Sequence, residues 1–179
     1  MESKAKLFGH PIHTILIVFP LGLLATSIIF DIINLATGNG YWSAIAYWMI
    51  YAGIIGGLTA AIFGLIDWLA IPRGTRAKAV GLLHGLGNAV VILLFIGSCL
   101  LRRDVPSEPS TLALALSFLG AGLATITGWL GGELVNRMGV GVDTGAHLNS
   151  PNSLSGRPAS EGVKGVEVET ELPRPRRVA

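Results

Sequence analysis

The sequence predicts an all-α integral membrane protein, a four-helix bundle followed by a disordered C-terminal tail. Its 179 residues are 51% apolar and only 13% charged, whereas about 25% of residues in soluble domains are charged. Four apolar runs each reach or exceed the roughly 20 residues that a helix needs to cross the hydrocarbon core of a bilayer. Most charged residues fall between or outside these runs, where they avoid the cost of burial in lipid.

A short N-terminal segment, residues 1–11, precedes the first predicted span, residues 12–35. Pro11 suits the first turn of a helix, because its missing N–H is not needed there. Pro20 lies inside the span and predicts a kink. The apolar run is longer than the 7–15 or so residues of a signal-peptide core, so we expect this span to be retained.

The other three spans are predicted at residues 44–71, 79–101 and 110–135. Small residues recur at helical spacing in the second span, as in Gly53 and Gly57, and this pattern predicts close helix packing in lipid. The apolar runs are unbroken rather than alternating. They therefore do not fit the strands of a membrane barrel.

The composition changes after the fourth span. Residues 138–179 are rich in Gly, Pro, Ser and Glu and show no helical period, so we expect a disordered tail. The chain has a single cysteine, Cys99, which rules out an intramolecular disulfide. Its basic residues form no stripe interleaved with aromatic residues, so the expected surroundings are a lipid bilayer and not nucleic acid.

The distribution of lysine and arginine predicts the orientation of the bundle. Because the number of spans is even, both termini lie on one side of the membrane. Six basic residues near the spans share that side: Lys4, Lys6, Arg73, Arg76, Lys78 and Arg137. The other side carries only Arg102 and Arg103. The pattern predicts that the N-terminal segment and the tail are both cytoplasmic.

Ionisable side chains recur at one level of the predicted bundle. At a rise of 1.5 Å per residue, the cytoplasmic ends of the spans bring together three histidines and two carboxylates: His10, His13, Asp67, His84 and Glu133. Asn88, Trp129 and Asn136 are expected beside them. Asp31 remains alone near the opposite end, with Asn34 one turn further on.

This layer of side chains fits three functions that need a ligand or a transferred ion. His13 and His84 come from two helices at similar depth, as the axial ligands of a b-type haem require. Together with His10, Asp67 and Glu133 they would suit a bare zinc, iron or manganese ion, because imidazole and carboxylate ligands are mixed. A chain of Asp67, His84 and Glu133 would suit proton or ion transfer.

The rival class is a structural or partner-binding membrane protein whose polar side chains satisfy one another, because polar residues in spans usually pair inside the bundle. No catalytic residue is predicted. The sequence holds no nucleophile elbow, phosphate-binding loop or dinucleotide motif. The isolated chain is therefore not expected to be an enzyme. His147 falls in the predicted tail and is expected to be solvated.

Two motifs resemble a bacterial family of membrane proteins, the domain of unknown function 2231. The first runs from Gly9-His10-Pro11-Ile12-His13 to Phe19-Pro20-Leu21-Gly22, and the second runs from Gly128 to Val135. Between them, Asp67 and the pair His84-x-x-x-Asn88 are similar to the middle motifs of the family.

This resemblance implies a four-helix protein of the bacterial inner membrane. Some members of the family are joined to iron–sulfur (Rieske-type) or cytochrome-like domains, which implies a redox setting. Besides the bilayer, we expect a redox protein or a second copy of the chain as partner. The resemblance implies no activity.

Overall fold

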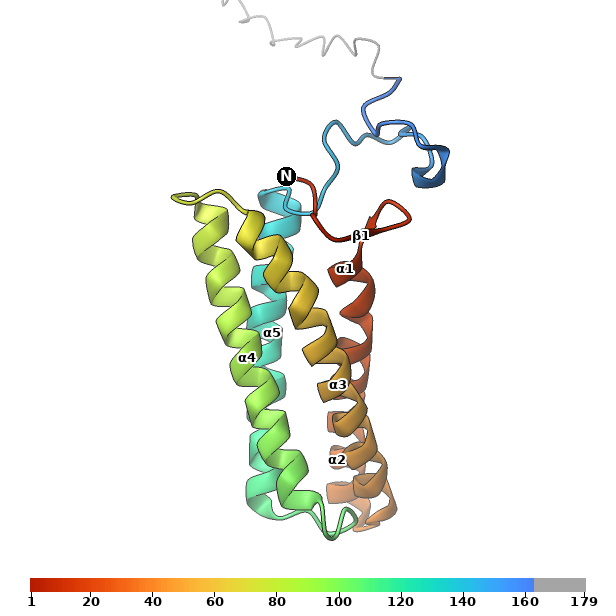
Figure 1. Ribbon diagram of the computed structural model, residues 1–179. Coiled ribbons are helices and arrows are strands. Elements are labelled where there is room, and N and C mark those ends of the chain that lie inside the picture. The colour runs from red at the N-terminus through yellow and green to blue at the C-terminus, as the bar shows by residue number, and fades with distance from the viewer. Residues whose placement is uncertain (163–179) are drawn as a thin grey trace, which may run out of the picture.

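The computed structural model describes residues 1–162, and residues 163–179 lie outside the described part. In chain order the elements are β1 (Lys6–Leu7), β2 (His10–Pro11), α1 (Ile12–Leu16), α2 (Val18–Thr37), α3 (Tyr41–Ala70), α4 (Arg76–Arg102), α5 (Thr111–Gly132), a π-helical turn η1 (Glu133–Arg137) and a 3-10 turn η2 (Ser153–Ser155). Within the described residues, four segments are long and apolar enough to cross a membrane: Ile12–Thr37, Tyr41–Ala70, Arg76–Arg102 and Thr111–Arg137. The all-α membrane fold class is therefore confirmed (Figure 1).

The first span is interrupted at Ile17, between α1 and α2. Pro20 has no N–H to donate to the carbonyl of Leu16, and its ring crowds that carbonyl. The regular helix therefore stops just before Pro20 and resumes where the Leu21 N–H donates to the carbonyl of Ile17 at 3.1 Å. The kink expected from Pro20 takes the form of this short break.

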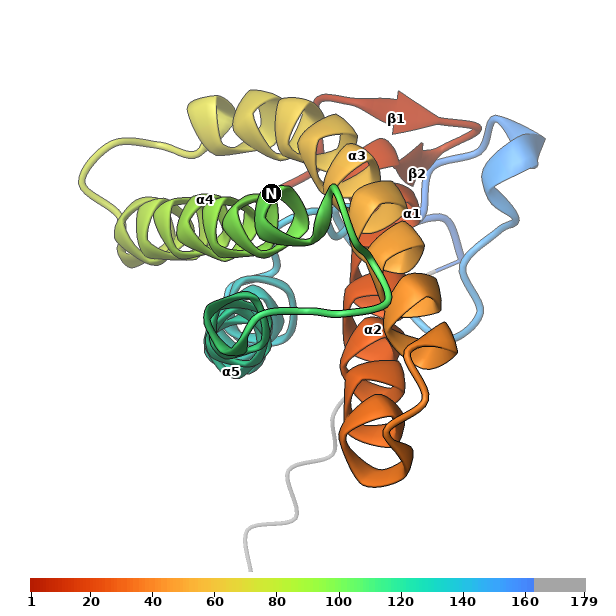
Figure 2. The same ribbon diagram turned by 90° about the horizontal axis from the view of Figure 1, so that it is seen from below.

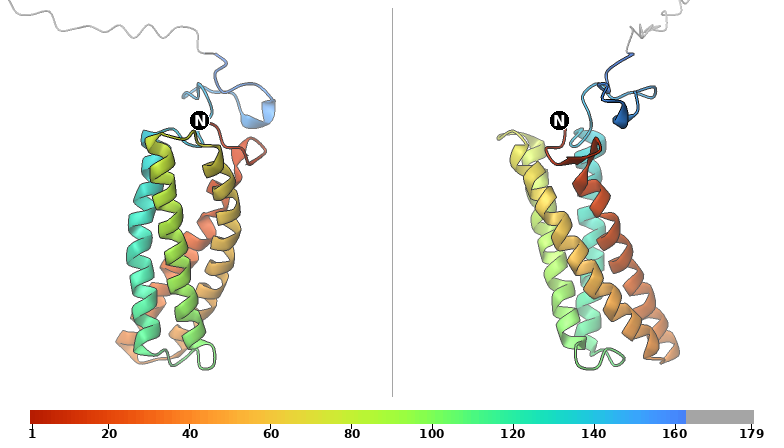
Figure 3. Two further views of the ribbon diagram at one scale, coloured as in Figure 1. Left: turned by 60° about the vertical axis from the view of Figure 1, so that its left-hand side comes forward. Right: turned by 45° about the vertical axis from the view of Figure 1, so that its right-hand side comes forward.

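The four spans pack as two antiparallel pairs. α2 lies along α3 and α4 lies along α5, while α3 and α4 join the two pairs (Figures 2 and 3). Short connections at residues 38–40, 71–75 and 103–110 reverse the chain between successive helices. An apolar cluster between the helices forms the core: Leu24, Tyr47, Ile50, Val91, Phe95 and Cys99.

Glycines on α3 let its neighbours approach closely. A Cβ built on Gly53 would lie 2.6 Å from Cδ2 of Leu24, and one built on Gly57 would lie 2.5 Å from Cδ1 of Ile92. Both distances are overlaps, so a larger residue would force these neighbours to move. The packing role predicted for the small residues of the second span agrees with these contacts.

The outward faces of the spans are apolar. Each span exposes large aliphatic side chains, for example Leu21, Leu58, Leu93 and Leu119. In water, apolar exposure around all four helices would promote aggregation, whereas lipid tails cover it without penalty. The exposure pattern is that of a protein surrounded by lipid.

Residues 1–11 and 138–162 lie together over one end of the bundle and are here called the cap (Figures 1 and 3). The bundle end beneath it is the cap end, and the end with the loops 38–40 and 103–110 is the loop end. The segments 1–11 and 138–162 are tied by backbone hydrogen bonds, such as Gly141 N–H to the carbonyl of Met1 at 2.8 Å.

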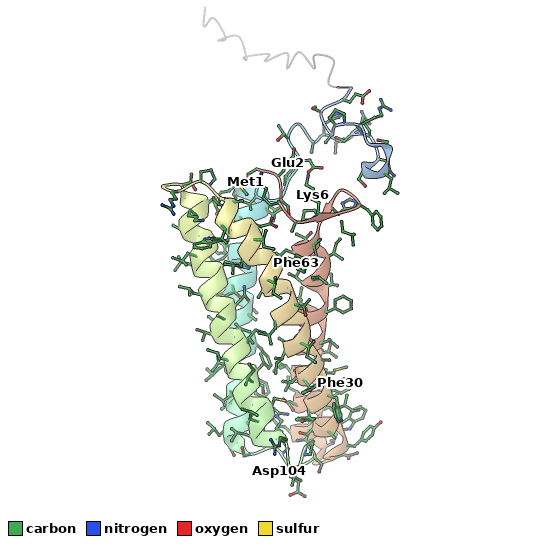
Figure 4. All side chains as sticks on the ribbon, in the orientation of Figure 1. Met1, Glu2, Lys6, Phe30, Phe63 and Asp104 are labelled. Carbon is green, nitrogen blue, oxygen red and sulfur yellow. The ribbon has the colours of Figure 1, made fainter. Side chains whose placement is uncertain are left out.

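Charged side chains also join the two segments of the cap. Lys6 forms ion pairs with Glu2, at 2.9 Å, and with Asp143, and the Glu2 carboxylate accepts the Thr144 N–H at 3.2 Å. The hydrogen bond from Lys6 and then that from Thr144 lower the pKa of Glu2 to about 2. Figure 4 shows Glu2 and Lys6 together at the cap end, far from Asp104 at the loop end.

The sequence predicts disorder from Met138 onward, whereas the structure gives residues 138–162 a course of turns. The prediction and the structure differ because the composition of a segment gives no information on its contacts with distant parts of the chain. The groups that hold residues 138–162, such as Glu2 and Lys6, come from the far end of the chain. The rest of the predicted tail lies outside the described residues.

Candidate functional site: two histidines at one level of the bundle

Two of the side chains predicted to bind a metal, His10 and Asp67, form hydrogen bonds with residues of the cap instead. His10 lies on the exposed strand β2, where its Nε2 is 3.3 Å from the hydroxyl of Ser153. The Asp67 carboxylate accepts hydrogen bonds from the Ser3 hydroxyl at 2.8 Å and from the Lys4 backbone N–H at 2.7 Å. Asp67 thus anchors the N-terminal segment to the end of α3.

Three further predicted residues lie near the end of the fourth span. Glu133 forms an ion pair with Arg76 at 3.0 Å, which links the end of α5 to the start of α4. Trp129 is 65% exposed, and Asn136 is also exposed. These two side chains face the surroundings of the bundle rather than its interior.

His13 lies in the first turn of α1, and its ring reaches α3. Its Nδ1 is 2.9 Å from the carbonyl oxygen of Ala60. Because a carbonyl oxygen only accepts, Nδ1 must carry the proton, and the neutral ring keeps a lone pair on Nε2. Gly64 lies against the same ring, since a Cβ built there would be 2.8 Å from Cε1 of His13. A larger residue at this position would displace the imidazole.

His84 repeats this arrangement between α4 and α5. Its Nδ1 is 2.8 Å from the carbonyl oxygen of Thr127. By the same reasoning the neutral ring keeps the lone pair of Nε2. Gly131 lies against the ring, because a Cβ built there would be 3.1 Å from Cε1 of His84. Both histidines therefore combine a backbone carbonyl at Nδ1 with a glycine against the ring.

Asn88 braces His84 from one turn further along α4. Its Nδ2 lies 3.2 Å from Nε2 and 3.4 Å from Nδ1 of the ring. If Nδ2 of Asn88 lay in the plane of the His84 ring at these distances from both nitrogens, it would overlap ring atoms such as Cε1. The amide therefore lies over the face of the ring, and not along the direction of the Nε2 lone pair. Nδ2 donates to the carbonyl of His84 at 3.0 Å, and Oδ1 accepts from the Thr127 hydroxyl at 2.9 Å. Asn88 fixes the ring without occupying Nε2.

The helix contacts place His13 and His84 at one level of the bundle. α3 and α4 run antiparallel, with Gly57 against Ile92. Two helical turns further toward the cap end on each helix, Gly64 comes level with the turn of α4 that carries His84. His13 lies against Gly64.

Within residues 1–162, no group of three or more His, Cys, Asp or Glu side chains is arranged to hold a metal ion. Three of the five residues expected to share a metal have the other partners described above: His10, Asp67 and Glu133. The arrangement that remains is a pair of imidazoles. Such a pair suits a cofactor that takes two axial nitrogen ligands better than a bare ion, which takes four or more ligands.

A second polar cluster lies at the loop end. Nη1 and Nη2 of Arg102 donate to the two carboxylate oxygens of Asp31 at 2.6 and 2.7 Å, and both side chains are 0% exposed. Arg102 also donates to the hydroxyls of Ser98 and Ser117, each at 3.1 Å. This cluster joins α2, α4 and α5 inside the bundle.

The expectation that Asp31 stands alone is therefore wrong. The predicted third span ends at residue 101 and leaves Arg102 outside it with Arg103, whereas α4 continues through Arg102, whose side chain is buried inside the bundle. The signal for the pair was present in the sequence. Asp31 lies about two turns before the end of the first span and Arg102 is the last residue of the third, both toward the loop end.

The fold and these two clusters define a class of protein: a four-helix integral membrane protein with a buried ion pair at one end and a histidine pair near the other. The family model described as "Predicted membrane protein (DUF2231)" matches residues 9–144, well over half of the chain. The chain belongs to this family, and the resemblance noted from its motifs is confirmed. No curated protein and no solved structure matches the chain.

Proposed function

We propose that this protein is a small membrane subunit that binds a b-type haem between His13 and His84, in a redox setting. One observation carries the proposal: at each histidine, Nδ1 donates to a backbone carbonyl, so the proton is on Nδ1 and Nε2 has the lone pair that a metal ligand needs. A hydrogen bond of this kind fixes the tautomer of a metal-ligating histidine, orients its ring and raises its basicity. At His84 the amide of Asn88 lies 3.2 Å from Nε2, over the ring face and beside the direction of that lone pair.

Gly64 and Gly131 let the two imidazoles lie directly against the backbones of α3 and α5. His13 and His84 would hold the haem, and the carbonyls of Ala60 and Thr127 would keep each Nε2 aimed at it. When bound, haem supplies one-electron transfer, with a potential tuned by its axial ligands and their hydrogen bonds.

The same geometry favours haem over the two other ligand or transfer functions. A bare transition metal needs more ligands than two imidazoles provide. Proton or ion transfer through His84 would require free carboxylates nearby. The carboxylate of Asp67 is occupied by the cap, and that of Glu133 is paired with Arg76.

A structural or partner-binding membrane protein is the second candidate. It is favoured by the same carbonyl contacts, because Nδ1 of His13 and of His84 already has a partner inside the bundle. In that case the two imidazoles act as packing elements that cross-link α1 to α3 and α4 to α5. A spectrum of the purified protein separates the two candidates.

For the orientation we propose that the cap end faces the cytoplasm and that the membrane is the bacterial inner membrane. The basic residues of the cap end support this: Lys4, Lys6, Arg73, Arg76, Lys78 and Arg137. At the loop end, Arg102 is neutralised inside the bundle by Asp31. Of the two arginines expected there, Arg103 alone is exposed, against six basic residues at the cap end.

The test is an absorption spectrum of the full chain purified in detergent, together with iron analysis. The expected result is a Soret band that sharpens on reduction, with stoichiometric iron. His13→Ala and His84→Ala should each abolish or strongly reduce the band, because a bis-imidazole haem loses one axial ligand.

His10→Ala and His147→Ala serve as matched controls, since both histidines lie in the cap outside the bundle, and both variants should keep the band. A colourless, iron-free preparation that is stably folded, even when expressed with added haem precursor, would reject the haem proposal and favour the structural candidate.

A further inference from the structure

The turn between β1 and β2 presents an unusual residue at its tip. Phe8 and Gly9 are the two turn residues, with φ of +50° and +83°. Leu7 pairs with His10 across the turn. Two positive φ values match the tight hairpin turn that glycine, asparagine and aspartate favour. Within the described residues, Phe8 is the one residue other than glycine with positive φ.

A phenylalanine in this conformation is strained, because its Cβ crowds the following carbonyl, and bulky residues are outliers here. Its side chain is 73% exposed, and that of the neighbouring Leu7 is 49% exposed. Residues 1–162 therefore give the Phe8 ring little cover to offset the backbone strain. Contacts beyond these described residues would have to provide that cover.

The position of the hairpin indicates what lies against these side chains. The first span starts at Ile12, directly after β2, and the hairpin projects to the side of the bundle beside α1 (Figures 1 and 2). Exposed apolar residues continue from there down the outward face of the span, beginning with Ile15 and Val18. Leu7 and Phe8 thus extend the lipid-facing surface past the start of the helix.

The length of the span sets the level of the tip. Ile12–Thr37 has 26 residues, which corresponds to roughly 39 Å of helix against a hydrocarbon core of about 30 Å. Its first turn therefore lies at the membrane interface, and so does the hairpin that precedes it. Phe and Leu side chains on segments that lie along a membrane surface bury themselves at this level of a bilayer.

We propose that the tip of this hairpin, Leu7 and Phe8, inserts into the interfacial region of the lipid bilayer and anchors the cap to the membrane surface. The hairpin is tied to the rest of the cap, because Lys6 pairs with Asp143 and Gly9 packs against Ser153. An anchored tip therefore holds the whole cap over the bundle end. This inference does not depend on haem binding.

The test uses the full chain in vesicles of phosphatidylcholine and phosphatidylglycerol. Cys99 is the single cysteine, so a Cys99→Ala background allows one nitroxide label to be placed at Phe8→Cys. Collision rates with oxygen and with a water-soluble nickel chelate report the depth of the label. Leu21→Cys, on the lipid face of α2, and Leu148→Cys, on a fully exposed cap residue, are the references.

The expected oxygen-to-nickel ratio at Phe8 is several-fold higher than at Leu148 and approaches that at Leu21. A ratio equal to that of Leu148 would overturn the anchor and point instead to a protein partner over the apolar tip.

If the labelled variant does not fold, hydrogen exchange of residues 6–11 in Phe8→Asn gives a second readout. Asparagine accepts the positive φ and removes the apolar ring, so exchange in vesicles should become several-fold faster than in the wild-type chain. Unchanged or slower exchange would overturn the proposal.

Discussion

Arg102 on α4 and Asp31 on α2 form a two-point ion pair, at 2.6 and 2.7 Å, in which neither side chain has any exposed surface. The hydroxyls of Ser98 and Ser117 accept further hydrogen bonds from the guanidinium group of Arg102. The pair is therefore neutral and well satisfied by hydrogen bonds. Inside a membrane bundle this matters, because an uncompensated charge is expensive there.

Breaking this pair from one side should destabilise the bundle strongly. Arg102→Leu leaves the Asp31 carboxylate buried without its partner, which typically costs about 3–5 kcal/mol. The double variant Asp31→Leu/Arg102→Leu should recover most of that loss, because it removes both charges. The measurement is denaturant-induced unfolding in detergent.

Arg103→Leu is the control for this series. Its side chain is 73% exposed, so the change should stay within about 0.5 kcal/mol. Equal stabilities of the Arg102 and Arg103 variants would contradict the structural role of the pair.

Alanine at the glycines beside the histidines should disturb the site. Gly64→Ala places a Cβ 2.8 Å from the His13 ring, and overpacking of this kind costs about 1–3 kcal/mol. Gly131→Ala should have a smaller effect, because the corresponding distance at the His84 ring is 3.1 Å. The readouts are unfolding in detergent and, where haem is bound, the position of the Soret band.

Gly85→Ala and Gly128→Ala are the matched controls, since a Cβ at either position meets nothing within 4 Å. Both are glycines inside helices, so these variants should be neutral or gain up to about 1 kcal/mol. A loss in the controls as large as in Gly64→Ala would mean that the ring contact is not the cause.

The clip between Glu2, Lys6 and Thr144 should survive mild acid. The pKa of Glu2 is lowered from 4.5 to about 2. Its contribution to cap stability is therefore complete above about pH 4.5 and is lost as the pH falls toward about 2. The Thr144 amide shift, followed by NMR in detergent, should titrate with a midpoint near 2.

Glu2→Gln provides the control, because its Thr144 amide should show no such step. Added salt should move the midpoint in the wild-type chain upward, since the groups are exposed and their attraction is screened. A midpoint near 4.5 at low salt would show that the clip is not formed.

The proposed orientation predicts the behaviour of reporter fusions. Alkaline phosphatase joined after Arg137 should be inactive and a fluorescent protein at the same point should be bright, because the proposed orientation places that junction in the cytoplasm. The same reporters placed at Ser107, in the loop-end connection, should give the opposite result. Active phosphatase after Arg137 would reverse the bundle in the membrane.

The four-helix bundle could be predicted because the length and hydropathy of a segment are enough to identify a membrane span. The starts of the helices were less predictable: α3 begins at Tyr41 rather than at residue 44, and α4 begins at Arg76 rather than at residue 79. Polar and aromatic residues at the membrane surface continue a helix whose apolar part is all that a hydropathy reading detects.

The sequence could predict the depth of His13 and His84 in the bundle, but not the groups that contact their rings. Spacing along the spans brings His13 and His84 to one depth, and the structure adds the carbonyls of Ala60 and Thr127. Backbone acceptors leave no trace in the sequence. The pairing of Asp67 with Ser3 was equally invisible, because it depends on how the N-terminal segment folds back over the end of α3.

The cap has a consequence for how the protein is made. Glu2 meets Thr144 across 142 residues and Lys6 meets Asp143 across 137, while synthesis runs from the N-terminus. Glu2 and Lys6 are therefore translated long before their partners and wait for them until the fourth span has been made. A chain that stalls before Asp143 can insert its helices and bind Ser3 and Lys4 at Asp67, but it lacks the contacts of Glu2 and Lys6 that close the cap.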